Sequence, residues 1–251
     1  MKTETMLGTL LVMGLAAGPL AAGSGRDARA ILDKVDDLYR SRSSHARMVM
    51  RVVTEHWSRE LTMEAWTKGK ERSLVRILAP KKEKGMATLK VGNDIWNWLP
   101  KVKRVMKVPS SMMSDSWMGS HFTNDDMVKE SRMADDYDFQ VTFSGERRGK
   151  QVVEITCIPK PQAPVEWGQV VVLVEDGSWL PLLMTYYDED GELARTFTFS
   201  AVKKMGGRTI PTEMRIVPAN KPGEYTLVRY QDIEFDVELP DDMFSLRRLR
   251  R

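Results

Sequence analysis

The sequence predicts a mainly β protein with a few α-helices, and three features of its 251 residues support this fold class. Hydrophobic and polar side chains alternate over many short segments, which is the period-two pattern of strands with one buried face. Turn signals separate these segments at spacings of about 8–12 residues, as in an antiparallel sheet. One segment near the N-terminus has the helical period instead. We therefore expect a helix followed by a long series of hairpin-connected strands.

The first 23 residues have the layout of a secretory signal peptide. An almost wholly apolar run, Met6 to Leu20, is followed by the small residues Ala21-Ala22-Gly23, which suit cleavage. A membrane-spanning helix needs roughly 20 apolar residues, more than this run supplies. We expect 1–23 to be a cleaved signal peptide and 24–251 to form one exported domain. A retained anchor is the alternative.

The helical pattern covers residues 27 to 41. Asp27 can cap the helix, because its carboxylate can accept from free amides of the first turn. Charged residues separate an apolar stripe at helical spacing, which is made of Ala28, Ile31, Leu32, Val35, Leu38 and Tyr39. The helix is expected to end near Ser41.

About eleven or twelve strands are predicted after the helix, in segments rich in Val, Ile, Thr and aromatic residues. Asp176-Gly177 and Asp190-Gly191 are strong tight-turn signals between them. The expected strands cover 48–52, 61–66, 74–78, 95–99, 139–143, 151–158, 169–174, 180–187, 193–199, 213–217, 225–230 and 233–237.

Residues 106 to 138 break the strand pattern. They are predicted to be irregular, with one or two short helices; Thr123-Asn124-Asp125-Asp126 is expected to cap a helix that runs to about Met133. A long insertion without strands inside a β domain is often a lid or a binding loop.

Composition excludes several classes of function. A net charge of +3 is too small to indicate nucleic-acid binding. Cys157 is the only cysteine, so an intramolecular disulfide and a multi-cysteine zinc or iron–sulfur site are excluded. On a predicted strand, Cys157 is expected to be a small buried residue. It also lies far from the predicted cleavage site, so the mature protein is not expected to carry a lipid on an N-terminal cysteine.

No strong catalytic or metal-binding motif is present. His45, His56 and His121 lack the spacing of zinc ligands. Ser120, next to His121 and near Asp125, leaves an enzyme such as a hydrolase as a weak hypothesis. The acidic stretch 188–192 is expected to be a solvated hairpin turn rather than a calcium loop. The sequence thus predicts no catalytic residues, no metal site and no cofactor.

An unusual supply of methionine and tryptophan indicates an apolar pocket. Of the 17 methionines, six lie within residues 106–133, and methionine side chains can repack around apolar groups of varied shape. An ordinary core is the alternative interpretation. The residues predicted to bind acyl chains are Trp66, Trp96, Trp98, Met106, Met112, Met113, Trp117, Met118 and Phe122. The segment from Met106 to Met133 is hypothesised to be the lid of this pocket.

Four stretches carry a resemblance to a known family: 30–40, Trp96-Asn97-Trp98-Leu99-Pro100 with the basic residues after it, 119–126, and 239–246. They resemble the outer membrane lipoprotein-sorting family of LolA-like and LolB-like carriers. The resemblance implies a half-open antiparallel β-barrel of about eleven strands, with helices covering its concave face. It also implies an apolar cavity for the acyl chains of lipids or lipoproteins. No Arg matches the key functional Arg of the best-studied carriers, so none is carried over.

The resemblance implies a periplasmic carrier that moves lipids or lipoproteins toward the outer membrane. The alternative is an accessory subunit that docks on an RND-like inner-membrane transporter without carrying cargo itself. The basic runs at 81–84, 101–107 and 247–251 have two interpretations: a solvated face, or transient contact with an anionic membrane or an acidic partner.

Overall fold

The computed structural model describes residues 26–39, 41–129, 136–163 and 165–251. The predicted signal peptide therefore lies outside the described residues. The first half of the sheet consists of β1 (Ser43–Val53), β2 (Ser58–Lys68), β3 (Arg72–Ala79), β4 (Ala87–Val91), β5 (Asp94–Leu99) and β6 (Arg104–Lys107). The second half consists of β7 (Tyr137–Arg147), β8 (Lys150–Pro159), β9 (Gln169–Glu175), β10 (Pro181–Tyr187), β11 (Leu193–Met205), β12 (Arg208–Pro218) and β13 (Tyr225–Phe235).

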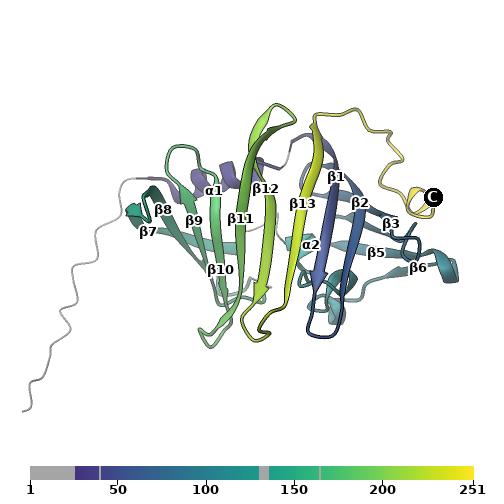
Figure 1. The fold of residues 1–251 in the computed structure, drawn as a ribbon, viewed down its shortest axis with the longest axis horizontal. Coiled ribbons are helices and arrows are strands. Elements are labelled where there is room, and N and C mark those ends of the chain that lie inside the picture. The colour runs from purple at the N-terminus through teal and green to yellow at the C-terminus, as the bar shows by residue number, and fades with distance from the viewer. Residues whose placement is uncertain (1–25, 40, 130–135, 164) are drawn as a thin grey trace, which may run out of the picture.

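These strands form one antiparallel sheet in the order β6-β5-β4-β3-β2-β1-β13-β12-β11-β10-β9-β8-β7. Each half is a meander, and the halves join where β1 pairs with β13. Figure 1 shows the sheet as a curved wall, with β1 and β13 near its middle. The sheet is open, because its edge strands β6 and β7 do not pair with each other in this order. The predicted half-open antiparallel architecture is confirmed.

The described residues contain thirteen strands, not about eleven. Two short strands were missed: β4, in which four of five residues are buried, and β6, a basic edge strand of four residues. The residues of β6 show no period-two pattern, whereas β4 alternates apolar and polar residues over only five positions. Conversely, the two segments predicted at 225–230 and 233–237 are one strand, β13. A register shift opposite Arg47 and Met48 breaks its alternation.

The first helix, α1 (Ala28–Asp37), begins where predicted. Asp27 caps it by accepting a hydrogen bond from the amide of Ala30 at 3.2 Å. The helix ends at Asp37 rather than near Ser41. Beyond that end, Tyr39 stacks on Tyr230 and donates a hydrogen bond to the carbonyl of Pro211.

The chain between β6 and β7 must pass from one edge of the sheet to the other. This segment contains the short helices η2 (Ser110–Met112), η3 (Trp117–Gly119) and α2 (Asp126–Lys129). Thr123 and Asp126 form the expected cap of α2: the Asp126 amide donates to Oγ1 of Thr123, and the Thr123 amide donates to Oδ2 of Asp126. The predicted continuation to Met133 lies outside the described residues. In Figure 1, α2 lies behind the central strands.

Both faces of the sheet carry apolar clusters. The larger cluster joins α1, Trp117 and Phe122 to the concave face. A smaller cluster lies on the opposite face of β3 and β4, where Leu249 of the C-terminal helix α4 (Leu246–Leu249) packs against Leu74 and Leu89. Figure 1 shows the yellow C-terminal segment extending past β1 and β2 toward this side. Because both faces are covered, apolar residues of the first half of the sheet do not all point to one core.

Candidate functional site

A cavity of about 250 Å³ lies between the concave face of the sheet, α1 and the segment that follows β6. Its lining comes from both halves of the sheet. Apolar and aromatic side chains make up most of the lining: Val35, Tyr39, Met48, Met50, Met63, Ala65, Val75, Trp117, Phe122, Met127, Pro181, Met184, Tyr186, Phe199, Met214, Val228 and Tyr230. Six of these are methionines, so the wall can adapt to apolar groups of different shapes.

The structure brings only some of the nine predicted site residues to this cavity. Trp117 and Phe122 line it, and Met118 is half-buried against the same cluster. Met113 is half-buried but not in the lining, while Met106 and Met112 are 51% and 45% exposed. The remaining three, which pack on the opposite face of the sheet near α4, are Trp66, Trp96 and Trp98.

The cavity methionines missed by the sequence analysis come mainly from strands. Met48 and Met50 are two residues apart in β1, and Met63 lies opposite Met48 in β2. Side chains two residues apart share a face of a strand, so this spacing was an available signal. Met184 and Met214 lie on strands of the other half of the sheet, and only the folded chain shows that they meet the first three.

Trp117 fixes the covering segment, which is the described chain between β6 and β7 (residues 108–129), to the sheet. Its indole Nε1 donates to Oγ1 of Thr88 at 3.0 Å, and its amide donates to the carbonyl of Phe122 at 2.7 Å. The rings of Trp117 and Phe122 pack edge to face, with their centroids 6.4 Å apart. The turn between them requires a left-handed backbone at Gly119, where φ is +62°. The covering segment is therefore held in a defined conformation over the cavity.

A buried ion pair joins the covering segment to the second half of the sheet. Arg195 of β11 is 5% exposed, and its Nη1 and Nη2 donate to the two carboxylate oxygens of Asp126 at 2.7 and 2.5 Å. Burial opposes the guanidinium charge, but Asp126 outweighs it and raises the pKa of Arg195 above its ordinary value. The guanidinium carbon also lies 4.4 Å from the ring centre of Trp167 and 4.7 Å from that of Tyr186.

Charged side chains border one side of the cavity, at the end of α1 and the β2–β3 turn. Lys70 Nζ lies 3.8 Å from Oδ2 of Asp36, and Arg72 is exposed nearby in the lining. Lys90 is buried and donates to the carbonyls of Lys70 at 2.7 Å and Val128 at 3.3 Å. The cavity thus combines an apolar wall with a polar rim, which suits an amphiphilic ligand.

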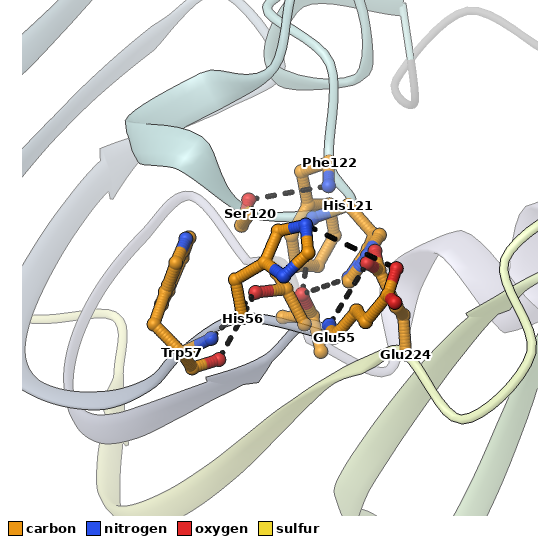
Figure 2. Close-up of polar contacts among 9 residues, drawn as sticks. Glu55, His56, Trp57, Ser120, His121, Phe122 and Glu224 are labelled. Carbon is orange, nitrogen blue, oxygen red and sulfur yellow. Dashed lines mark hydrogen bonds and ion pairs between the residues drawn. The ribbon is translucent and has the colours of Figure 1, made fainter.

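The hydrolase hypothesis requires contact between Ser120 and His121, and both side chains bind other groups. The Ser120 hydroxyl donates to the carbonyl of Trp117 at 2.7 Å. The His121 ring forms two hydrogen bonds. Its Nδ1 is 2.9 Å from Oγ1 of Thr226, and its Nε2 is 3.0 Å from Oε2 of Glu224. Figure 2 shows this polar cluster beside the Glu55–Trp57 turn. Ser120 and His121 are thus positioned to hold the covering segment in place, rather than as a nucleophile and its base.

The other two histidines and the cysteine lie away from the cavity lining. His45 stacks on Trp66 with ring centres 5.1 Å apart, and His56 is exposed. Cys157 is fully buried, and burial raises the pKa of its thiol to about 12, which confirms the prediction of a small buried residue. Within the described ranges, no group of three or more His, Cys, Asp and Glu side chains is placed to hold a metal ion.

The Glu224 contact predicts an acid-sensitive part of the stability. His121 first, and then the amide of Glu55, lower the pKa of the Glu224 carboxyl below its ordinary 4.5. A carboxyl group whose pKa is lowered by folding stabilises the folded protein at pH values above its unfolded-state pKa. This stabilisation is lost as the pH falls through the folded-state pKa. Glu224→Gln should therefore lower the urea midpoint near pH 7, with a smaller difference near pH 3. An equal difference in urea midpoint at both pH values would contradict a stabilising role of the ionised Glu224. Glu238→Gln, at an exposed position, serves as the control.

No helix in the described part of the chain is long and apolar enough to cross a membrane.

Comparisons with known proteins agree with this architecture. A DUF1329 family protein from Desulfovibrio piger superposes with a TM-score of 0.79 and 22% identity, covering 88% of this chain and 97% of the other. A putative outer membrane lipoprotein-sorting protein domain from Vibrio parahaemolyticus superposes with a TM-score of 0.75 and 22% identity, covering 89% of this chain and 98% of the other. A LolA superfamily protein from Nitrosomonas europaea superposes with a TM-score of 0.74 and 23% identity, covering 88% of this chain and 98% of the other. At these identities, the likeness shows the fold.

The sequence was also compared with curated proteins and with family models. No curated protein matches it. The model of a family described as uncharacterized proteins matches residues 69–251. Since that match covers well over half of the chain, the protein belongs to this family, and it has the LolA-like fold that the sequence resemblance implied.

Proposed function

We propose that the protein is a periplasmic carrier that binds acyl chains of lipids or lipoproteins in its cavity and moves them toward the outer membrane. The observation that carries this proposal is the methionine-rich cavity between the curved sheet and the segment that crosses its open side. The predicted signal peptide at 1–23 supports the location. The fold shared with a putative lipoprotein-sorting domain supports the class of function.

Acyl chains fit the chemistry of the cavity. Each buried CH₂ group favours binding by about 0.8 kcal/mol, and the methionine side chains can adjust to chains of different length or unsaturation. Binding of several CH₂ groups is therefore strong enough to retain cargo in water. Release then requires either movement of the covering segment or an acceptor that binds the cargo better.

The covering segment is the proposed lid. Trp117, Phe122 and Met127 close the cavity from this segment, and the contacts of Asp126 and His121 fasten it to β11 and β13. These anchors are polar, so they can break and re-form as the lid moves. Among the predicted acyl-chain residues of this segment, Trp117 lines the cavity, whereas Met113 does not.

Native mass spectrometry and lipid extraction test the carrier function directly. Protein purified from the periplasm of its own cells, without detergent, is expected to carry extra mass that organic solvent removes as lipid or lipidated protein. Protein that is free of lipid but co-purifies with an RND-like transporter would contradict the carrier function and favour the accessory-subunit alternative. Turnover of lipid that is lost in a Ser120→Ala variant would instead favour an enzyme.

A further inference from the structure

We propose that a basic tip at one end of the sheet docks the protein on an anionic lipid bilayer. The basic tip consists of the β3–β4 turn with Lys81, Lys82 and Lys84, the β5–β6 turn with Lys101, Val102 and Lys103, and Arg104 at the start of β6. This surface is separate from the cavity, since none of these residues lines it. The proposal concerns where the protein binds a membrane, and it does not depend on which cargo the cavity holds.

The two turns lie next to each other although they are separate in sequence. Strands β3, β4 and β5 are consecutive neighbours in the sheet, so both turns are at the same end of it. A Cβ atom built on Gly85 would lie 3.7 Å from Cγ of Pro100, so the two turns lie side by side. The second turn is the short helix η1 (Pro100–Val102), and Lys103 ends it in a left-handed conformation with φ of +50°.

The charge of the basic tip is concentrated and open to solvent. Its six cationic side chains are exposed, and Glu83 is the acidic residue between them in the first turn. Among the described residues, none of the six forms an ion pair, whereas the neighbouring Lys107 binds Asp94 at 2.9 Å. Unpaired cations gathered on one surface produce a positive potential that attracts anionic surfaces over about 8 Å at physiological salt.

An exposed apolar side chain lies among these cations. Val102 is 59% exposed between Lys101 and Lys103, and Met106 on the adjacent strand is 51% exposed. On a bilayer, an apolar side chain can enter the headgroup region while the long lysine side chains extend their charges to the lipid phosphates. The combination of Val102 with flanking lysines therefore fits a membrane surface.

A protein partner fits these residues less well. Lysine is depleted in protein–protein interfaces, which favour aromatic residues and arginine at their centres. Five of the six cations here are lysines, and the basic tip is made mainly of turns. A fluid anionic surface requires no matched shape, so it can use flexible lysines that a specific protein interface would have to immobilise.

Sedimentation with lipid vesicles tests the proposal. The full-length mature protein is expected to bind vesicles of phosphatidylglycerol and phosphatidylcholine, to bind weakly to phosphatidylcholine alone, and to dissociate at high salt. A variant with Lys81→Gln, Lys101→Gln and Lys103→Gln should bind the anionic vesicles roughly 100-fold more weakly. Val102→Ser should weaken binding by a similar factor at each salt concentration at which the unmodified protein binds, because it removes apolar contact rather than charge.

The matched control removes three exposed lysines elsewhere: Lys203→Gln, Lys204→Gln and Lys221→Gln. It has the same net charge as the test variant and should retain vesicle binding. Equal losses in both variants would overturn a localised docking surface, and failure of the unmodified protein to bind anionic vesicles would overturn membrane docking altogether. Circular dichroism checks that both variants fold. Cavity occupancy, measured by native mass spectrometry, should be unchanged in the test variant, which separates this proposal from the carrier function.

Discussion

Replacing Arg195 with methionine is expected to lower the free energy of unfolding by about 3–5 kcal/mol. Arg195 and Asp126 have side chains that are 6% and 15% exposed, and they are joined by two hydrogen bonds. Removal of the guanidinium leaves the Asp126 carboxylate largely out of water with no cation beside it. The aromatic rings of Trp167 and Tyr186 also lose their stacking partner.

Urea denaturation followed by tryptophan fluorescence measures this loss. The control is Arg229→Met, which removes the exposed ion pair of Arg229 with Glu213, at 2.7 Å on the outside of the sheet. An exposed pair contributes about 0–1 kcal/mol, so the control should change stability little. Equal losses in the two variants would show that the buried Arg195 pair stabilises the protein no more than an exposed pair does. A double variant, Arg195→Met with Asp126→Leu, should recover part of the loss, because it leaves no unpaired charge.

Replacing Met184 with aspartate is expected to reduce lipid occupancy of the cavity at least tenfold. Met184 is half-buried on β10 and lines the cavity. An acyl chain in contact with this position would have to take the carboxylate out of water, and such a charge without a partner is costly. A loss of about 1.4 kcal/mol is already a tenfold change in affinity. Since Met184 is not fully buried, the empty protein should remain folded.

Native mass spectrometry of protein purified without detergent gives the occupancy, and near-UV circular dichroism reports the fold. Met184→Leu should retain the lipid, because it keeps an apolar side chain of similar size. Met106→Asp is the matched control: Met106 was predicted to bind acyl chains but is 51% exposed on β6, away from the lining. Unchanged occupancy in Met184→Asp, or equal loss in Met106→Asp, would contradict the placement of acyl chains in this cavity.

The predictions that succeeded depend on interactions between residues close in sequence. Asp27 caps α1 and Thr123 caps α2 through hydrogen bonds that span three residues. The turns at Gly177 and Gly191 have φ of +84° and +79°, which glycine adopts without steric cost. These features appear in the structure at the expected positions, because no distant part of the chain is needed to form them.

The tryptophans show where sequence reasoning failed. Trp66, Trp96 and Trp98 lie on apolar strands, and an apolar strand normally faces the single core of a sheet. Here the C-terminal segment covers the opposite face with Met243, Phe244 and Leu249. Periodicity divides side chains between two faces, but it does not say what covers each face. The three tryptophans were therefore assigned to the cavity although they pack behind it.

By itself, the sequence determined the antiparallel meander, the caps and turns, and the interruption between residues 106 and 138, since each is set by local pattern. Only the tertiary structure decided which side chains meet in the cavity. Met50 and Met184 lie on different halves of the sheet, and Arg195 pairs with Asp126 across 69 residues. The physical reason is the pairing of β1 with β13, which joins the two meanders. The resulting curved sheet brings residues that are far apart in sequence to one concave face. A local sequence pattern does not show which distant residues meet there.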